Sequence, residues 1–147
     1  HWALAVAGSG LSTPAVYRAL DQRRRARGHP WAAEFIPPPQ PDARLLDALA
    51  RGDTMALSAL LDNDLETVAI SLRPQLAATF ATGRASGALA SVLCGTGATI
   101  AFLAQDARQA EHIADRLLAA GVCESVLVAH GPVAGPTADP LSGAAGA

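Results

Sequence analysis

The chain has 147 residues, of which 50% are hydrophobic and 16% are charged. This composition predicts a packed core and excludes an intrinsically disordered chain. The net charge of -2 gives no general attraction to nucleic acid or to an acidic membrane, and no apolar run is long enough to span a bilayer. Two cysteines make no disulfide framework, which is typical of a reducing compartment. We therefore expect a cytoplasmic globular protein, with neither nucleic acid nor a membrane among its partners.

The two ends of the sequence predict different states. An apolar run over residues 2–7 predicts a buried strand, and it is too short and lacks the basic flank for a signal peptide. A strand so close to the first residue suggests that a preceding domain is missing from the chain. Residues 132–147 are rich in Pro, Gly, Ala and Ser, so we expect a disordered tail after a domain of residues 1–131.

Cap and breaker residues divide the first two thirds of the chain into helices. A helix is expected from Pro14 to about Arg27 with Ser12 as its N-cap, followed by a stiff proline-rich connection over residues 29–41. Further helical segments are predicted in order: one capped by Asp42, with an apolar stripe of Leu45, Leu46 and Leu49, ending at Gly52; one capped by Asp53 and reaching Leu61; one from Asn63 to Leu72; and one that restarts at Pro74 and frays near residues 83–87.

The last third of the chain predicts strands on either side of one helix. Residues 89–93 and 98–104 read as two strands, and Val126–Val128 as a third. Between them, Asp106 and Gln109 form a capping-box pattern ahead of a helix that Gly121 ends. The amphipathic stripe of this helix is Ala110, Ile113, Ala114, Leu117 and Leu118. The order predicts an α+β fold: a ferredoxin-like four-stranded antiparallel sheet with helices on one face and a helical insertion.

The turn Cys94-Gly95-Thr96-Gly97 is the first candidate for chemistry. Two glycines let a backbone approach a ligand closely and direct N–H groups at an anion, and Thr96 and Thr99 add hydroxyl groups. A hairpin turn with permissive residues is the alternative, which the local pattern by itself favours.

The loop Gly8–Thr13 is a second candidate, because it precedes a helix N-terminus that can accept a phosphate or a polar ligand. Tyr17 lies one helical turn beyond Thr13, where it can stack on a flat ring or pack at the edge of the core. An ordinary strand-to-helix loop and a core-edge tyrosine are the alternatives that these residues alone favour.

Other charged or reactive residues read as structural. The arginines of residues 23–27 fit a solvated helix end, and Asp62, Asp64 and Glu66 fit capping and surface roles. The four histidines show no metal-ligand spacing, with His112 expected at the surface, and the two cysteines are expected to be free thiols. No metal site and no catalytic residue are therefore assigned within this chain.

Three segments resemble a known family. Residues 2–17 are similar to the opening of the C-terminal domain of GHMP kinases, in particular of the branch that acts on CDP-methylerythritol. Asn63-Asp64-Leu65-Glu66 resembles a helical element of that branch, and residues 93–99 resemble the third GHMP motif, usually Ser-Gly-(Ser/Thr)-Gly and a small residue. The segments follow the family's order and spacing from Trp2 to Pro132.

The resemblance implies roles for the two candidate loops. Thr13 would lie in the substrate-contacting loop, and Tyr17 would stack on the cytosine ring. Residues 95–97 would face the substrate and support the phosphate site. Cys94 stands where the family commonly has Ser or Thr, so no hydroxyl contact is carried over to it.

The implied reaction transfers the γ-phosphate of ATP to the 2-hydroxyl of CDP-methylerythritol, with Mg²⁺, in non-mevalonate isoprenoid precursor biosynthesis. In the family an N-terminal domain carries the ATP loop, the catalytic aspartate and a lysine, and this chain has neither that loop nor any lysine. The chain alone is therefore expected to be inactive, with the N-terminal domain as its partner. Two alternatives remain open: another GHMP kinase, of the homoserine or mevalonate type, or a non-catalytic ferredoxin-like ligand-binding module.

Overall fold

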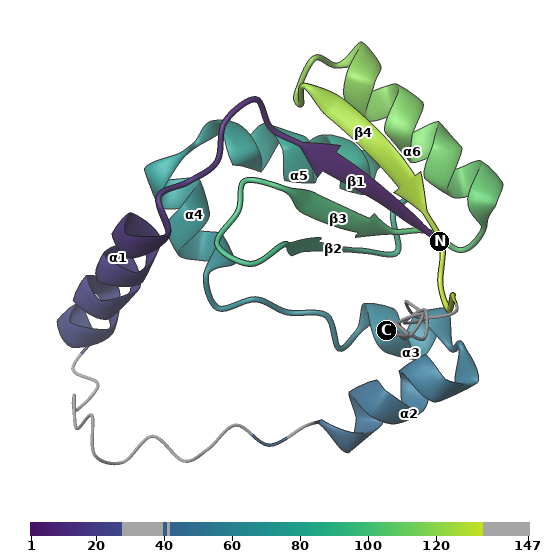
Figure 1. The fold of residues 1–147 in the computed structure, drawn as a ribbon, viewed down its shortest axis with the longest axis horizontal. Helices are drawn as coiled ribbons and strands as arrows, with labels where there is room; N and C mark the ends of the chain where they lie inside the picture. The colour runs from purple at the N-terminus through teal and green to yellow at the C-terminus, as the bar shows by residue number, and fades with distance from the viewer. Residues whose placement is uncertain (28–39, 41, 134–147) are drawn as a thin grey trace, which may run out of the picture.

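The computed structural model describes residues 1–27, 40 and 42–133 (Figure 1). In chain order its elements are β1 (Trp2–Val6), α1 (Thr13–Ala26), α2 (Ala43–Arg51), α3 (Thr54–Ser58), α4 (Glu66–Leu72), α5 (Gln75–Ala85), β2 (Ala90–Leu93), β3 (Ile100–Leu103), α6 (Ala107–Ala119) and β4 (Ser125–Ala129). The predicted proline-rich connection and the predicted tail lie outside the described residues, apart from residue 40 and residues 132–133. None of the described helices is long and apolar enough to cross a membrane.

The four strands form one antiparallel sheet in the order β2-β3-β1-β4. This is the strand order of a ferredoxin-like sheet, in which β2 and β3 form a hairpin while β1 pairs with β3 and β4, both distant in the sequence. Helices α5 and α6 pack against one face of the sheet and against each other, as Figure 1 shows. The predicted α+β fold is therefore confirmed. The helical insertion is the segment α1–α4, which precedes α5, the first helix that packs on this face of the sheet.

The strand register brings two loops to the same end of the sheet, where β1 and β2 finish and β3 begins. Ala5 near the end of β1 pairs with Ile100 at the start of β3, and Ile100 pairs with Leu93 at the end of β2. Because these three residues are in line across the sheet, the segment that follows β1 and the turn between β2 and β3 leave the sheet side by side.

Alternation along the strands directs one set of side chains into the main core. Ala3, Ile100 and Phe102 are fully buried beneath α5 and α6, and the rings of Phe80 and Phe102 meet edge to face with their centroids 6.5 Å apart. The predicted stripe of α6 is buried at four of its five positions. Leu118 is the exception, 47% exposed, because it falls at the margin of the face that α6 presents to the sheet.

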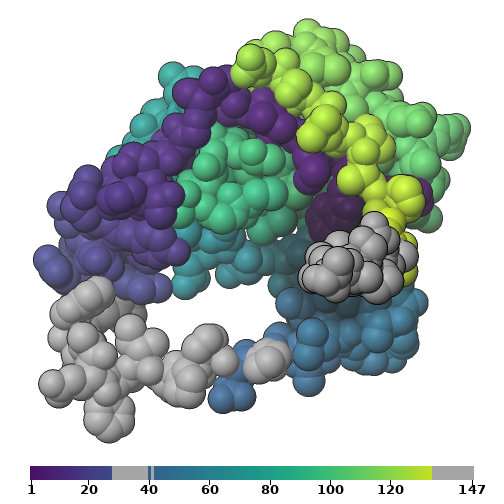
Figure 2. Space-filling view, in the orientation of Figure 1, coloured from purple at the N-terminus to yellow at the C-terminus, as the bar shows by residue number. Residues whose placement is uncertain are grey.

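The inserted helices α2 and α3 cover part of the opposite face. Leu103 points to this face and forms a second, smaller core with Ala48 of α2 and Leu57 of α3. The leucine stripe predicted for α2 is only partly correct, because Leu46 and Leu49 are each 54% exposed and Ala48 is the buried residue of this helix. Figure 2 views this face, where atoms of the strands remain visible at the surface between α1 and the α2–α3 pair.

The helix boundaries follow the predicted caps. The side chains of Asp42, Asp53 and Asp106 accept hydrogen bonds from the backbone of α2, α3 and α6, respectively. Gly52 and Gly121 follow α2 and α6 with φ of 63° each, the left-handed conformation that suits glycine at a helix end. Side-chain hydrogen bonds thus set where these helices begin, and a left-handed glycine sets where α2 and α6 end.

Candidate functional site

The two loops that carry the predicted site residues touch each other. The hydroxyl oxygens of Thr13, at the first position of α1, and Thr96, in the turn between β2 and β3, lie 3.1 Å apart and share a hydrogen bond. These residues are separated by 83 positions in the sequence, and the strand register described above brings them together. The structure therefore combines two separately predicted loops into one candidate site.

The turn between β2 and β3 requires glycine for two reasons. Gly95 and Gly97 have φ of 56° and 90°, a region that other residues rarely adopt. A Cβ added to Gly97 would lie 3.0 Å from Cδ1 of Leu93 and 3.3 Å from Cδ1 of Leu11. Leu11 belongs to the first loop, so the small size of Gly97 allows the second close approach between the two loops.

The same turn leaves two consecutive amide groups available to a ligand. The N–H of Cys94 donates to the carbonyl oxygen of Thr99, and the N–H of Gly97 donates to that of Cys94. Within the described part of the chain, the N–H groups of Gly95 and Thr96 donate to no acceptor. Two such neighbouring donors are suited to an anionic oxygen.

The first loop leads into α1 and places Tyr17 one turn along that helix. Ser12 is the N-cap residue of α1, as predicted, but its side chain makes no capping hydrogen bond, so the start of α1 lacks side-chain capping. Tyr17 is 50% exposed, which leaves part of its ring accessible to a planar partner. The stacking role of Tyr17 and the substrate contacts of both loops stay predictions.

Asn63 holds the glycine turn through hydrogen bonds from its side-chain amide. It was not predicted as a site residue. Its Nδ2 donates to the carbonyl oxygens of Leu93 at 2.7 Å and Gly95 at 2.9 Å, while its Oδ1 accepts from the N–H of Leu65 at 2.9 Å. The resemblance of residues 63–66 to a family element pointed to this segment, although nothing in the pattern identified the amide as a contact to the turn.

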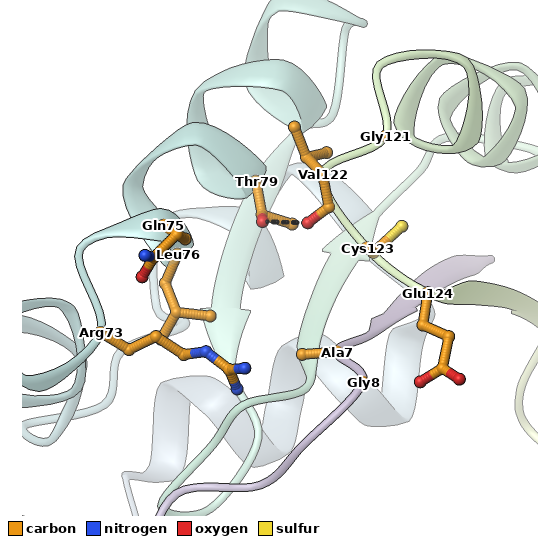
Figure 3. Close-up of a pocket in the computed structure, with 10 residues that line it drawn as sticks. All are labelled: Ala7, Gly8, Arg73, Gln75, Leu76, Thr79, Gly121, Val122, Cys123 and Glu124. Atoms are coloured by element: carbon orange, nitrogen blue, oxygen red, sulfur yellow. Dashed lines mark hydrogen bonds between the residues drawn. The ribbon is translucent and has the colours of Figure 1, made fainter.

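Arg73 holds the first loop through hydrogen bonds from its guanidinium. It too was not predicted as a site residue. Its guanidinium donates to the Ser9 hydroxyl at 2.7 Å and, through the other terminal nitrogen, to the Ser9 carbonyl oxygen. Figure 3 shows the Arg73 side chain extending from the end of α4 towards the chain that follows β1. No local signal marks this residue, because its partner lies 64 positions earlier in the sequence.

A pocket of about 340 Å³ lies behind the first loop, lined by Arg73, Gly8 and Glu124 among others. In Figure 3 Arg73 and Glu124 stand on opposite sides of it. Inside it, the Thr79 hydroxyl donates to the carbonyl oxygen of Val122 at 2.8 Å, which ties α5 to the segment before β4.

The charged residues near the site form surface contacts. Arg24 of α1 pairs with Asp64, next to Asn63, at 3.3 Å. The Asp62 carboxylate accepts from the N–H of Asn63, and partial burial raises the pKa of Glu66. Asp62 and Asp64 are exposed, as predicted, whereas α4 begins without a side-chain cap, so the predicted capping role is not found there. Among the described residues, no group of three or more His, Cys, Asp or Glu side chains is placed to hold a metal ion.

Both cysteines are free thiols, as predicted. Burial raises the pKa of the Cys94 thiol above its ordinary value, and a backbone hydrogen bond with Ala101 opposes that rise without cancelling it. At neutral pH Cys94 is therefore a neutral thiol at the edge of the glycine turn, and its chemistry differs from that of the hydroxyl which the family usually has there.

The sheet order defines a ferredoxin-like domain, and its two apposed loops form one candidate site. Residues 45–123 match the family model for the C-terminal domain of GHMP kinases. The chain therefore belongs to the GHMP kinase family, as its resemblance predicted.

Named relatives agree with this assignment. The chain is 49% identical over 137 residues to a 4-diphosphocytidyl-2-C-methyl-D-erythritol kinase of Streptomyces coelicolor, covering 93% of the chain and 44% of that protein. It is 51% identical over 135 residues to the kinase of the same name from Salinispora tropica, covering 92% of the chain and 41% of that protein. The chain thus spans less than half the length of these curated relatives.

Solved structures share the fold. A crystal structure of 4-(cytidine 5'-diphospho)-2C-methyl-D-erythritol kinase matches 80% of the chain and 38% of that protein, with 28% identity and a TM-score of 0.56. The crystal structure of an L. major mevalonate kinase in complex with R-mevalonate matches 86% of the chain and 40% of that protein, with a TM-score of 0.58. The second is 20% identical and shows the fold alone.

Proposed function

We propose that this chain is the substrate-side domain of a kinase that transfers the γ-phosphate of ATP to the 2-hydroxyl of CDP-methylerythritol. The observation that carries the proposal is the hydrogen bond between Thr13 and Thr96, which joins the two loops expected to contact this substrate. The names of the relatives at 49% and 51% identity support the choice of substrate.

The proposed roles follow from what each group offers. The half-exposed ring of Tyr17 stacks on the cytosine, since every base has a flat face that an aromatic ring can cover. Thr13 and Thr96 offer hydroxyl groups, and the N–H groups of Gly95 and Thr96 face a phosphate oxygen of the substrate. These groups bind and orient the alcohol, and positioning is one of the two main contributions to catalysis in phosphoryl transfer, beside electrostatic stabilisation.

We assign ATP and Mg²⁺ chiefly to a second domain that precedes residues 1–131. The relatives are more than twice as long as the part that this chain matches, and the described residues offer no metal cluster. When bound, Mg²⁺ neutralises charge on the β- and γ-phosphates. We place the enzyme in the cytoplasm, where ATP is supplied and where the free thiols Cys94 and Cys123 stay reduced.

The test is a phosphorylation assay on the complete reading frame that contains this chain. The purified protein is mixed with ATP, Mg²⁺ and one of three alcohols: CDP-methylerythritol, mevalonate or homoserine. We expect a phosphorylated product from CDP-methylerythritol alone, identified by ³¹P NMR and mass spectrometry. Phosphorylation of mevalonate or homoserine instead would favour another GHMP kinase, and no product from any alcohol would favour a binding module.

A further inference from the structure

Helix α4 is connected at its two ends to the two loops of the candidate site. Asn63, three residues before α4, bonds to the carbonyl oxygens of Leu93 and Gly95 in the glycine turn. Arg73, the C-cap residue of α4, bonds to Ser9 in the loop after β1. The residues that flank this short helix therefore contact both loops, Asn63 through its amide and Arg73 through its guanidinium.

Helix α4 is itself fixed in the core. Its central residues Val68 and Ala69 are 1% and 0% exposed, and the helix packs against both α1 and α5. The pair between Arg24 and Asp64 adds a surface contact between α1 and the segment that holds Asn63. A buried helix with neighbours on two sides can serve as a fixed reference for the loops at its ends.

The two loops need support from a fixed helix because both are rich in glycine. Gly8 and Gly10 lie in the first loop, and Gly95 and Gly97 lie in the second. Glycine gives a chain more accessible conformations than any other residue, so ordering these loops is costly in entropy. Hydrogen bonds from a fixed helix restrict those conformations before a ligand arrives.

We propose that α4 sets the distance between the two substrate loops, with Asn63 and Arg73 as positioning residues for the reaction. The proposal rests on the proposed function for its substrate, but the restriction of the loops is independent of it. Loss of either side chain frees one loop while the other stays in place, so that the hydroxyl groups of Thr13 and Thr96 no longer meet at a fixed position.

Asn63→Asp tests the bond to the glycine turn. The remaining carboxylate still accepts from the N–H of Leu65, so the local turn before α4 is kept, while both donors to Leu93 and Gly95 are lost. The matched control is Gln109→Glu. Its amide also bonds to backbone, donating to Gly87 at 2.8 Å and accepting from the N–H of Gln105 at 2.6 Å, away from both loops.

Arg73→Gln tests the bond to the first loop. Arg73→Lys tests whether a positive charge without the planar guanidinium is sufficient to hold that loop. Arg51→Gln is the control, because Arg51 is paired with Asp47 at 2.6 Å within α2, and α2 packs chiefly against α3. All variants are made in the complete reading frame that contains this chain.

The first measurement is hydrogen exchange, which needs no substrate. Asn63→Asp should speed exchange of amides in residues 94–97, and Arg73→Gln in residues 8–12, with α6 and β4 unchanged. The two controls should leave both loops at the parental rate. Unchanged exchange in both loops would overturn the proposal, whatever reaction the protein catalyses.

The second measurement separates positioning from stability. With ATP and CDP-methylerythritol, we expect the KM for the alcohol to rise about 10- to 100-fold in Asn63→Asp and Arg73→Gln, the size of effect that a misplaced binding group produces. Arg73→Lys should recover part of this loss, and both controls should keep the parental KM. A parental KM in both loop variants would contradict the positioning role, whereas an inactive parent with loosened loops would overturn only the proposed function.

Discussion

Gly83 illustrates how one residue lets two elements come together. It lies inside α5, where glycine is usually unfavourable, and it is buried against β3. A Cβ at this position would lie 2.1 Å from Cε1 of Phe102, well inside contact distance. Phe102 is 0% exposed and packed in the main core, so its ring cannot turn out into solvent to make room. The absence of a side chain at this single position allows α5 to lie directly on the sheet.

Gly83→Ala is expected to lower the free energy of unfolding by about 1–3 kcal/mol, the usual cost of overpacking a core. The expected gain in helix propensity, about 1 kcal/mol at most, does not offset it. The measurement is the midpoint of urea-induced unfolding. Gly10→Ala is the control, because nothing lies within 4 Å of a Cβ there, and it should change the free energy by less than about 0.5 kcal/mol. A Gly83→Ala protein as stable as its parent would contradict the close contact between α5 and β3.

Cys94 gives a chemical probe of the glycine turn. Because burial raises its pKa, the reactive thiolate is a small fraction at neutral pH and grows as the pH rises. We expect iodoacetamide to modify Cys94 more slowly than free cysteine at pH 7.5. The modification of Cys94 should be faster at pH 9 than at pH 7.5. CDP-methylerythritol should slow modification of Cys94 but not of Cys123, whose pKa burial also raises. Peptide mass spectrometry reads both sites, and equal protection of the two would argue against substrate at the turn.

At the scale of elements, helix ends were the features that the sequence predicted best. An aspartate cap or a glycine stop acts on the backbone within four residues of itself, so a local pattern contains all of the information. Asp42, Asp53 and Gly121 each act where they were expected. The direction of the α2 leucines could not be read in the same way, because it depends on where α2 docks against Leu103, far away in the sequence.

The cap of α6 provides the test at this scale. The Asp106 carboxylate accepts from the N–H of Gln109 at 2.8 Å. Asp106→Ala removes that acceptor and should cost about 1 kcal/mol of stability, and Asp106→Ser should recover most of the loss because a hydroxyl also caps. Thermal unfolding followed by circular dichroism measures both. Equal losses in the two variants would mean that charge, and not capping, is the contribution of Asp106.

At the scale of the whole molecule, the order of elements and the resemblance of three segments predicted both the fold and the pair of loops. Neither predicted how the loops are held. Asn63 reaches Leu93 across 30 positions and Arg73 reaches Ser9 across 64, so these bonds exist only after the sheet and α4 have assembled. Local patterns report short-range interactions, and the geometry of this site depends on long-range ones.

The proposed assignment of ATP binding to a preceding domain predicts how the isolated chain behaves. The chain offers groups that bind and orient an alcohol, but it has no lysine and, among its described residues, no metal cluster. We expect residues 1–147 alone to transfer no phosphate from ATP to CDP-methylerythritol, whereas the complete reading frame turns over. Circular dichroism and gel filtration check that the isolated chain is folded. Turnover by the folded isolated chain would contradict the assignment of ATP binding to a preceding domain.

The most direct test of the central claim, that this domain recognises a cytidine diphosphate ester, is kcat/KM for CDP-methylerythritol in Tyr17→Ala compared with Tyr17→Phe. Stacking on a base contributes about 1–3 kcal/mol, so the alanine variant should lose about 5- to 150-fold in kcat/KM. The phenylalanine variant keeps the ring and should stay near the parental value, with the KM of ATP unchanged in both. Parental kcat/KM in Tyr17→Ala would contradict the account, because the cytosine would then be recognised elsewhere.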